Sequence, residues 1–222
     1  MKSRENIATI IELIKKECKE KNYKNPIVTE IADLTRSPFK VLVSCILSLR
    51  TKDAVTAQAS KRLFEIADTP EELIKLSEKE IERLVYPVGF YKTKAKNLIE
   101  ISKVLIEKYN SEVPNDENKL LELKGVGRKT MNIVMTYGFK SNNHIAVDSH
   151  VHQISNRLGW VKTNKPEETE KRLLKIIPKE YFYDLNDLFV IFGQNICVPV
   201  SPFCSKCPVN KYCKRVGIKR SR

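Results

Sequence analysis

The sequence of 222 residues has no long apolar run, no stretch rich in serine and glycine, and no internal repeat. A helix that spans a membrane needs about 18 or more consecutive apolar residues, and the N-terminal region lacks the apolar segment of a signal peptide. Runs that alternate between apolar and polar residues, which are typical of strands, are missing as well. We therefore expect an all-α, cytoplasmic protein with no membrane partner.

Acidic residues are fewer than basic ones. The chain has 40 lysines and arginines against 27 aspartates and glutamates, a formal net charge of +13. An excess of this size attracts polyanions over long distances and is not needed for folding. The balance favours nucleic acid over an acidic small molecule as partner, with a basic protein that has no such partner as the alternative.

Four of the six cysteines, Cys197, Cys204, Cys207 and Cys213, lie in the last quarter of the chain. In a reducing compartment this pattern favours a metal over disulfides, and so short a segment has too few apolar residues to fold by burial alone. The spacing allows tetrahedral zinc or a four-iron cluster. Cys18 and Cys45 lie in apolar helical contexts, and we interpret them as small buried hydrophobic residues.

Apolar spacing, caps and prolines predict a series of helices. They cover residues 6–20, 38–49, 93–109, 116–123, 148–158, 166–177 and 181–194. Short helices open at two predicted capping boxes, Thr69 with Glu72 and Ser77 with Glu80. Ser37 is predicted to be the N-cap of the helix at 38–49, and the stretch from Pro26 to Ile31 is predicted to be irregular.

Two glycines, Gly125 and Gly127, separate the helix at 116–123 from a second helix whose apolar side is marked by Met131, Val134 and Met135. Positive φ is cheap only for glycine, so the link can be very short, which predicts a helix-hairpin-helix. The alternative is a tight turn between packed helices with no ligand.

Such a link has a physical use. The backbone amides of Gly125, Val126 and Gly127 could approach a phosphate closely, and the positive end of the second helix would hold it. Arg128 and Lys129 follow directly and strengthen this interpretation.

Three motifs resemble the endonuclease III family of the helix-hairpin-helix DNA glycosylase superfamily. They are LKGVGRKT from Leu123, VDSHV from Val147, and the four cysteines with spacing x6, x2 and x5. The similarity runs from about Phe39 to Cys213. It implies two interleaved helical domains, a barrel-like one over 31–146 with the hairpin and a second from 1–30 plus 147–222 with an iron-sulfur loop. DNA would lie across the cleft between them, with Asp148 facing Lys129.

The resemblance assigns catalysis to Lys129 and Asp148. The positive helix end, Arg128 and partial burial all disfavour a charged lysine, and a neutral amine can attack a sugar C1′ and form a Schiff base. A plain phosphate contact is the alternative for Lys129. Asp148 could stabilise positive charge on the sugar, and it could also serve as a helix N-cap.

The resemblance also assigns a [4Fe-4S] cluster to the four cysteines in preference to zinc. Lys206, Lys211 and Lys214, in a segment without acidic residues from Cys197 onward, would form a phosphate-binding surface. The histidines at 144, 150 and 152 suggest a second metal site, but no carboxylate or thiolate pattern accompanies them.

A lesion inside a duplex can be reached only after the nucleotide is flipped out. Phe90 occupies the place of the family's wedge, with a core role as the alternative, and Lys92, Lys94 and Lys96 could bind the backbone. Arg50 stands where the family typically has glutamine. Its fork of donors suits an orphaned guanine better than an adenine.

We therefore predict a base excision repair enzyme, a bifunctional DNA glycosylase and abasic-site lyase that removes oxidised pyrimidines. Its partner would be double-stranded DNA with damaged bases or abasic sites, bound by a monomer at the prokaryotic nucleoid. A uracil or thymine mismatch glycosylase is the alternative within the superfamily. A non-catalytic DNA-binding protein is the alternative from another class.

Overall fold

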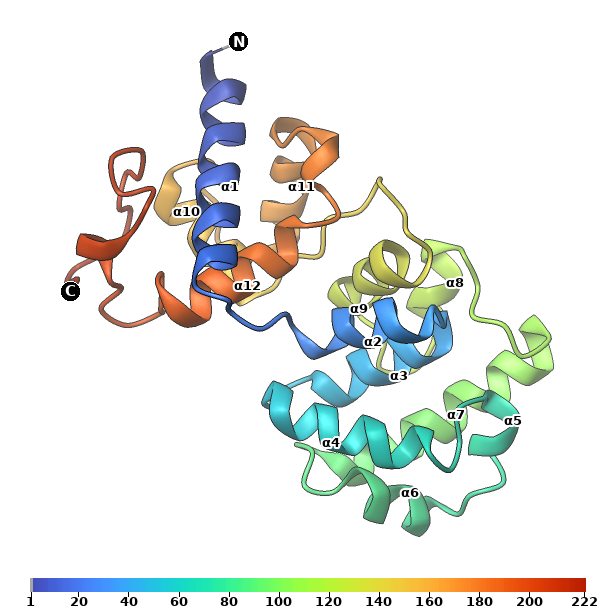
Figure 1. Cartoon of the computed structure of the whole chain (residues 1–222). Coiled ribbons are helices and arrows are strands. Elements are labelled where there is room, and N and C mark those ends of the chain that lie inside the picture. The colour runs from blue at the N-terminus through green and yellow to red at the C-terminus, as the bar shows by residue number, and fades with distance from the viewer. Residues whose placement is uncertain (1) are drawn as a thin grey trace. The chain divides into compact units, whose positions relative to one another are not determined.

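The computed structural model describes residues 2–222, with side chains from Asn6 onward, and in this range the regular elements are all helical (Figure 1). This confirms the all-α class. None of the helices in the range combines the length and the apolarity that crossing a membrane requires.

The chain forms two compact units. Ile27–Lys140 makes one, the hairpin unit, and Met1–Pro26 with Ser141–Arg222 makes the other, the cysteine-loop unit. The chain therefore begins in one unit, builds the second, and returns to complete the first.

The hairpin unit is built around α3, Pro38–Ser48, which contacts α2, α4, α7, α9 and η1. All residues of α3 from Val41 to Leu47 are buried, as expected for a helix that is apolar on every side. The other elements are α2 (Ile27–Thr35), α4 (Asp53–Phe64), α5 (Pro70–Leu73), α6 (Glu78–Val85), α7 (Tyr91–Tyr109), α8 (Glu117–Glu122), α9 (Arg128–Ile133) and the π-helical turn η1 (Val134–Gly138).

Two of these helices depart from the sequence expectation. The stretch from Pro26 was predicted to be irregular, but α2 begins at Ile27 and buries Val28, Ile31 and Ala32. Helix α4 was not predicted, because its buried positions carry mostly small or polar residues. Thr56, Ala59, Ser60 and Leu63 do follow helical spacing, so the helix packs closely without a marked apolar stripe.

The predicted helix caps are mostly present. The side chain of Ser37 accepts a hydrogen bond from the Lys40 amide ahead of α3, and Ser77 forms a reciprocal capping box with Glu80. The predicted capping box of Thr69 with Glu72 is wrong. Thr69 accepts from the Glu72 amide, but the Glu72 carboxylate reaches one residue further back and accepts from the amide of Asp68 at 2.9 Å.

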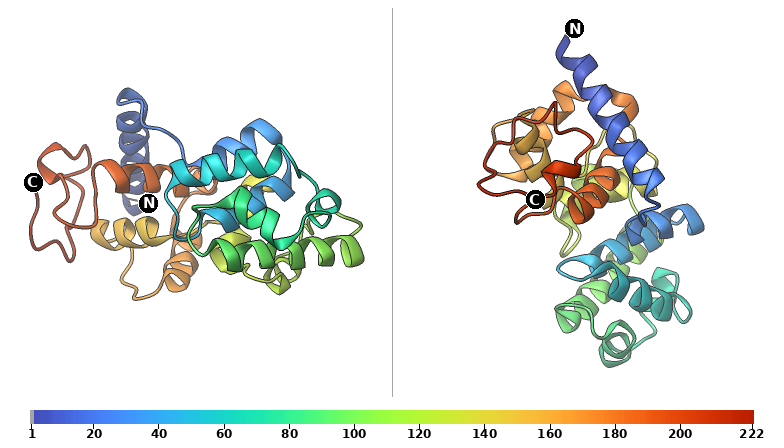
Figure 2. Two further views of the ribbon diagram at one scale, coloured as in Figure 1. Left: turned by 90° about the horizontal axis from the view of Figure 1, so that it is seen from below. Right: turned by 60° about the vertical axis from the view of Figure 1, so that its left-hand side comes forward.

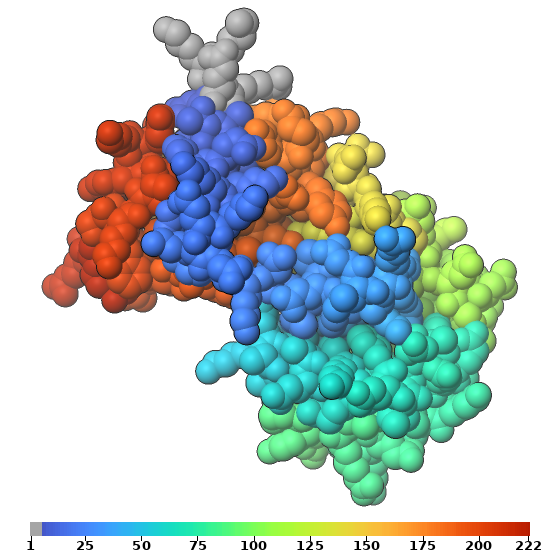
Figure 3. Space-filling model, viewed as in Figure 1, coloured from blue at the N-terminus to red at the C-terminus, as the bar shows by residue number. Residues whose placement is uncertain are grey.

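The cysteine-loop unit packs α1 (Lys2–Glu20) against α12 (Leu185–Asn195), together with α10 (Ser149–Leu158) and α11 (Pro166–Ile176). In Figure 3, α1 lies between α11 and the C-terminal segment at the surface of this unit. Its apolar side, Ile7, Ile10, Ile11 and Ile14, is buried. Two short 3-10 turns, η2 (Lys179–Tyr181) and η3 (Cys204–Lys206), complete the unit.

The last predicted helix starts later than expected. It begins at Leu185 and not at Tyr181, because a 3-10 turn precedes it. After α12 the chain continues as irregular loops next to α10 and α12 (Figure 2).

Replacing Ile11 with alanine should lower the free energy of unfolding of the cysteine-loop unit by about 2–5 kcal/mol, because a fully buried side chain leaves a cavity. Urea unfolding followed by circular dichroism measures this. The control is Lys16→Ala on the same helix, whose exposed pair with Glu20 contributes about 0.5 kcal/mol or less. Equal effects of the two changes would contradict the packing of α1.

Candidate functional site

The glycine link between α8 and α9 is held by its own backbone. The Val126 amide donates to the Leu123 carbonyl at 3.0 Å, and Gly125 between them has φ +80°. A Cβ at Gly125 would lie 2.8 Å from Nδ2 of Asn97, so both the conformation and the space require glycine here. The helix-hairpin-helix is present as predicted.

Gly127 does not have the positive φ that we expected for both glycines. Its φ is −99°, in the extended region open to any residue, and it is the N-cap of α9. A Cβ there would meet nothing within 4 Å. The conformation and the open space would accept a larger residue, so the uses that remain for this glycine are its N-cap position and close approach of a ligand to the backbone.

The side chains of the link divide into buried and exposed ones. Val126 is buried and anchors the turn, and its amide is paired with Leu123, so its predicted amide contact with a phosphate is wrong. Gly125 and Gly127 are exposed, and Arg128 and Lys129 in the first turn of α9 are half-buried. The turn thus presents main-chain amides at the surface with two cationic side chains beside them.

Lys129 lies within electrostatic range of two groups of the hairpin unit, Cys45 and Asp53. Burial raises the pKa of the Cys45 thiol and that of the Asp53 carboxyl, and the charge of Lys129 acts against both shifts. The sequence interpretation missed Asp53. The available signal was an acidic residue three positions after Arg50, in the first turn of α4.

Asp148 is the N-cap of α10. Its Oδ1 accepts a hydrogen bond from the Val151 amide at 2.9 Å, so the capping role considered for this residue is observed. The carboxyl group is half-buried, and Val147 and Val151 on either side of it are buried. Lys129 belongs to the hairpin unit and Asp148 to the cysteine-loop unit.

The three histidines have separate environments. His144 Nδ1 lies 2.8 Å from the hydroxyl of Ser141, and His152 Nδ1 lies 2.6 Å from that of Thr169. The ring of His150 packs against Gly193 so closely that a Cβ there would clash with it.

Phe90 and Arg50 lie together in the hairpin unit. The Phe90 side chain is 62% exposed, so the alternative of a core residue is wrong. The Arg50 guanidinium carbon lies 5.6 Å from the centre of the Phe90 ring, in cation–π range. The structure therefore brings these two predicted site residues into contact, although they are 40 positions apart in sequence.

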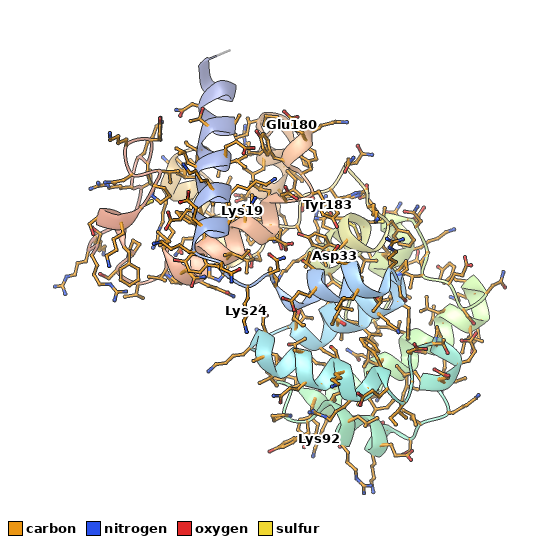
Figure 4. The ribbon with its side chains drawn as sticks, in the orientation of Figure 1. Lys19, Lys24, Asp33, Lys92, Glu180 and Tyr183 are labelled. Carbon is orange, nitrogen blue, oxygen red and sulfur yellow. The ribbon has the colours of Figure 1, made fainter. Side chains whose placement is uncertain are left out.

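The three lysines expected to bind a nucleic-acid backbone near Phe90 do not behave alike. Lys92 and Lys96 are exposed, and Figure 4 labels Lys92 at the surface near the start of α7. Lys94 is only 5% exposed, so a phosphate contact for it is wrong. The signal was its spacing, because Lys94 lies on the same helical face as Leu98, Ile101 and Leu105.

The cysteine loop is ordered by Arg157 of α10. Its guanidinium donates to the carbonyls of Cys197, Val198 and Pro199 at 2.7–3.0 Å, and to the sulfur of Cys197 at 3.4 Å. Arg157 itself is buried. One side chain thus satisfies three consecutive carbonyls that no helix or strand pairs.

All four cysteines of the loop are free and line a single cavity with Arg157. In the part of the chain that the structure describes, no three His, Cys, Asp or Glu side chains are arranged closely enough to hold a metal ion. The chemistry of the four thiols nevertheless suits a metal, because thiolates are metal ligands. Burial raises the pKa of the Cys197, Cys207 and Cys213 thiols, that of Cys207 to about 12, so these three thiols need a neighbouring cation to become thiolates. Cys18 and Cys45, by contrast, are buried among apolar residues as expected.

The predicted basic residues of the loop are at the surface. Lys206, Lys211 and Lys214 are all exposed. The stem of Lys214 packs over Gly159, the C-cap of α10 with φ +77°, where a Cβ would collide with it. This packing holds the base of the Lys214 side chain, although the residue as a whole is exposed.

The two glycines of the link offer a matched test. Gly125→Ala should lower the free energy of unfolding by roughly 1–2 kcal/mol, because alanine is strained at positive φ. Gly127→Ala should lower it by only about 0.5 kcal/mol, the cost of alanine at an N-cap, since its φ is ordinary and its surroundings are open. The second variant should bind duplex DNA more weakly in fluorescence anisotropy. Unimpaired binding by Gly127→Ala would show that no phosphate approaches this amide.

Known DNA repair proteins resemble this chain in sequence. Residues 43–179 match the family described as HhH-GPD superfamily base excision DNA repair protein. Endonuclease III of Thermotoga maritima is 49% identical over 177 residues, which cover 80% of this chain and 83% of that protein.

Solved structures match over almost the whole chain. A trapped endonuclease III–DNA covalent intermediate with an estranged adenine superposes with a TM-score of 0.84 at 35% identity, covering 97% of each chain. A thermostable thymine-DNA glycosylase gives 0.82 at 24% identity, over 96% of each chain, which shows a shared fold. This chain belongs to the endonuclease III family, within the HhH-GPD superfamily of base excision DNA repair proteins.

Proposed function

We propose that this protein is a bifunctional enzyme that removes oxidised pyrimidines from DNA and then cuts the strand at the abasic site. Membership of the endonuclease III family makes it a base excision repair DNA glycosylase. The lyase activity depends on one observation: Lys129 is half-buried in the first turn of α9, directly after the exposed glycine link. A phosphate held by the link would bring a sugar to this amine.

Lys129 acts as the nucleophile. Its neutral amine forms a bond to C1′ of the damaged nucleotide as the bond from C1′ to the base breaks, and the base leaves. The sugar ring opens to an imine between C1′ and Nζ. Loss of a C2′ proton then expels the 3′ phosphate, which completes the β-elimination. The carboxylate of Asp148 stabilises the positive charge that develops on the sugar and accepts protons.

Double-stranded DNA is the partner. The backbone amides of Gly125 and Gly127 bind phosphate, and Arg128 beside them adds charge. The Val126 amide, predicted for the same role, is used within the turn by the Leu123 carbonyl. The exposed Lys206, Lys211 and Lys214 of the cysteine loop bind further phosphates. The protein works as a monomer in the cytoplasm, at the nucleoid.

Phe90 and Arg50 enter the base stack of the DNA duplex once the damaged nucleotide has flipped out. Phe90, exposed and apolar, fills the gap, and Arg50 donates to the orphaned base opposite. An arginine at this position favours guanine, whose O6 and N7 accept both of its donors. The presence of Arg50 at this position is the observation that favours a uracil or thymine mismatch glycosylase as the second candidate function.

The four cysteines of the loop hold a [4Fe-4S] cluster, with zinc as the alternative metal. The cluster supplies order to a loop that has almost no core of its own, and base removal and elimination need no electron transfer. Arg157 fixes the backbone at the Cys197 end of the loop, so Cys197 is held in position before a metal binds.

Borohydride should trap the protein covalently on DNA that carries an abasic site, because it reduces the imine to a stable amine. Lys129→Gln should lose the trapped complex and at least about a thousandfold of the incision rate. The control is Lys124→Gln in the same link, whose side chain pairs with Glu100 at 2.9 Å and takes no part in the reaction. If active, DNA-binding protein gives no trapped complex, the lyase proposal is wrong.

Protein purified without oxygen should be brown and contain four irons per chain, as a four-iron cluster requires. Cys213→Ser should lose the colour and the iron and bind duplex DNA more weakly. Cys18→Ser, which changes a buried cysteine of α1, should keep the colour, the iron and the DNA binding. A colourless protein that contains zinc would contradict the four-iron cluster, but it would agree with a metal bound by the four cysteines.

A further inference from the structure

A buried cation lies beneath the loops that carry Arg50 and Phe90. Lys94, on the second turn of α7, is 5% exposed and lies on the apolar side of that helix. Burial lowers the pKa of Lys94 to about 8. A charged group in such a place is unfavourable unless its donors are all used.

Three oxygens accept hydrogen bonds from Lys94 Nζ. They are the carbonyls of Leu47 and Leu49, at 2.9 and 2.5 Å, and the hydroxyl of Thr51 at 3.3 Å. Both carbonyls belong to the C-terminal end of α3, where the helix dipole is negative and the last carbonyls lack partners within the helix. Lys94 therefore caps α3 from another helix and fixes the chain that leads into Arg50.

Thr51 extends this contact to the loop before Phe90. Its hydroxyl oxygen accepts a hydrogen bond from the Gly89 amide at 3.1 Å. The two loops also touch directly, since a Cβ on Gly89 would lie only 2.7 Å from the Arg50 carbonyl oxygen. Lys94, Thr51 and Gly89 thus form one connected set between α3 and α7.

The residues at either end of this set have an unusual backbone. Arg50 has φ +54° and Phe90 has φ +59°, in the left-handed region that favours glycine. A non-glycine residue keeps this conformation only where its surroundings impose it. The donors of Lys94 and the Gly89 amide supply that constraint, and the two side chains meet in a cation–π contact.

We propose that Lys94 is a positioning residue that fastens the Arg50 and Phe90 loops together, so that filling the gap and reading the orphaned base occur as one step. This inference rests on the proposed function of those two side chains. Lys94 touches neither DNA nor the reacting atoms. Its role is confined to duplex substrates, because a single strand has no opposite base to read and no stack to fill.

The test compares Lys94→Met, which keeps the length but loses the donors, with Lys94→Arg, which keeps the charge and donors. Each is assayed on a single-stranded abasic oligonucleotide and on duplexes with the lesion opposite guanine or adenine. For Lys94→Met we expect unchanged cleavage of the single strand. On the duplexes kcat/KM should fall about tenfold or more, and the guanine to adenine ratio should approach one. Lys94→Arg should restore most of both.

Lys103→Met is the matched control, since it makes the same change at an exposed position of the same helix. If Lys94→Met fails to fold, Thr51→Val carries the test, because it removes the shared hydroxyl and little volume. Thr51→Ser should then restore discrimination. A parallel loss on single-stranded and duplex DNA, or no loss on either, would overturn the inference. A wild-type protein that never forms a trapped complex would overturn the lyase proposal instead.

Discussion

The functional loops depend on buried cations that bind backbone carbonyls. Loops cannot pair their own carbonyls as helices do, and buried carbonyls without donors destabilise a fold. Arg157 satisfies three carbonyls after α12, and Lys94 satisfies two at the end of α3. In each unit a long cationic side chain from a helix thereby gives shape to the irregular segment that follows another helix.

The same constraint explains why the functional side chains can be exposed and still be ordered. Arg50 and Phe90 extend from a fixed backbone, and so does the glycine link, where the Val126 side chain is the buried anchor. Main-chain amides that are held in place and face solvent are suited to bind phosphate. Positive charge at the surface then adds affinity without having to build the site.

Sequence could predict the parts of the protein that local chemistry determines. The hairpin follows from two glycines between amphipathic segments, and the caps at Ser37 and Ser77 follow from short motifs. The contact of Arg50 with Phe90 was not predictable, because it depends on how two distant loops pack. Lys94 was wrongly predicted to be a surface lysine, because the prediction relied on its positive charge and not on its position on the apolar face of α7. Asp53 was missed because its one local signal, an acidic residue three positions after Arg50, does not relate it to Lys129.

The discontinuous cysteine-loop unit has a consequence for synthesis. Ile27–Lys140 is one continuous stretch, whereas α1 packs against α12, which is made about 165 residues later. On a ribosome the hairpin unit can therefore fold while α1 still has its isoleucine face uncovered. Helix α1 can bury this face only after α12 has been made, so its apolar side stays exposed to other chains while the hairpin unit is already folded.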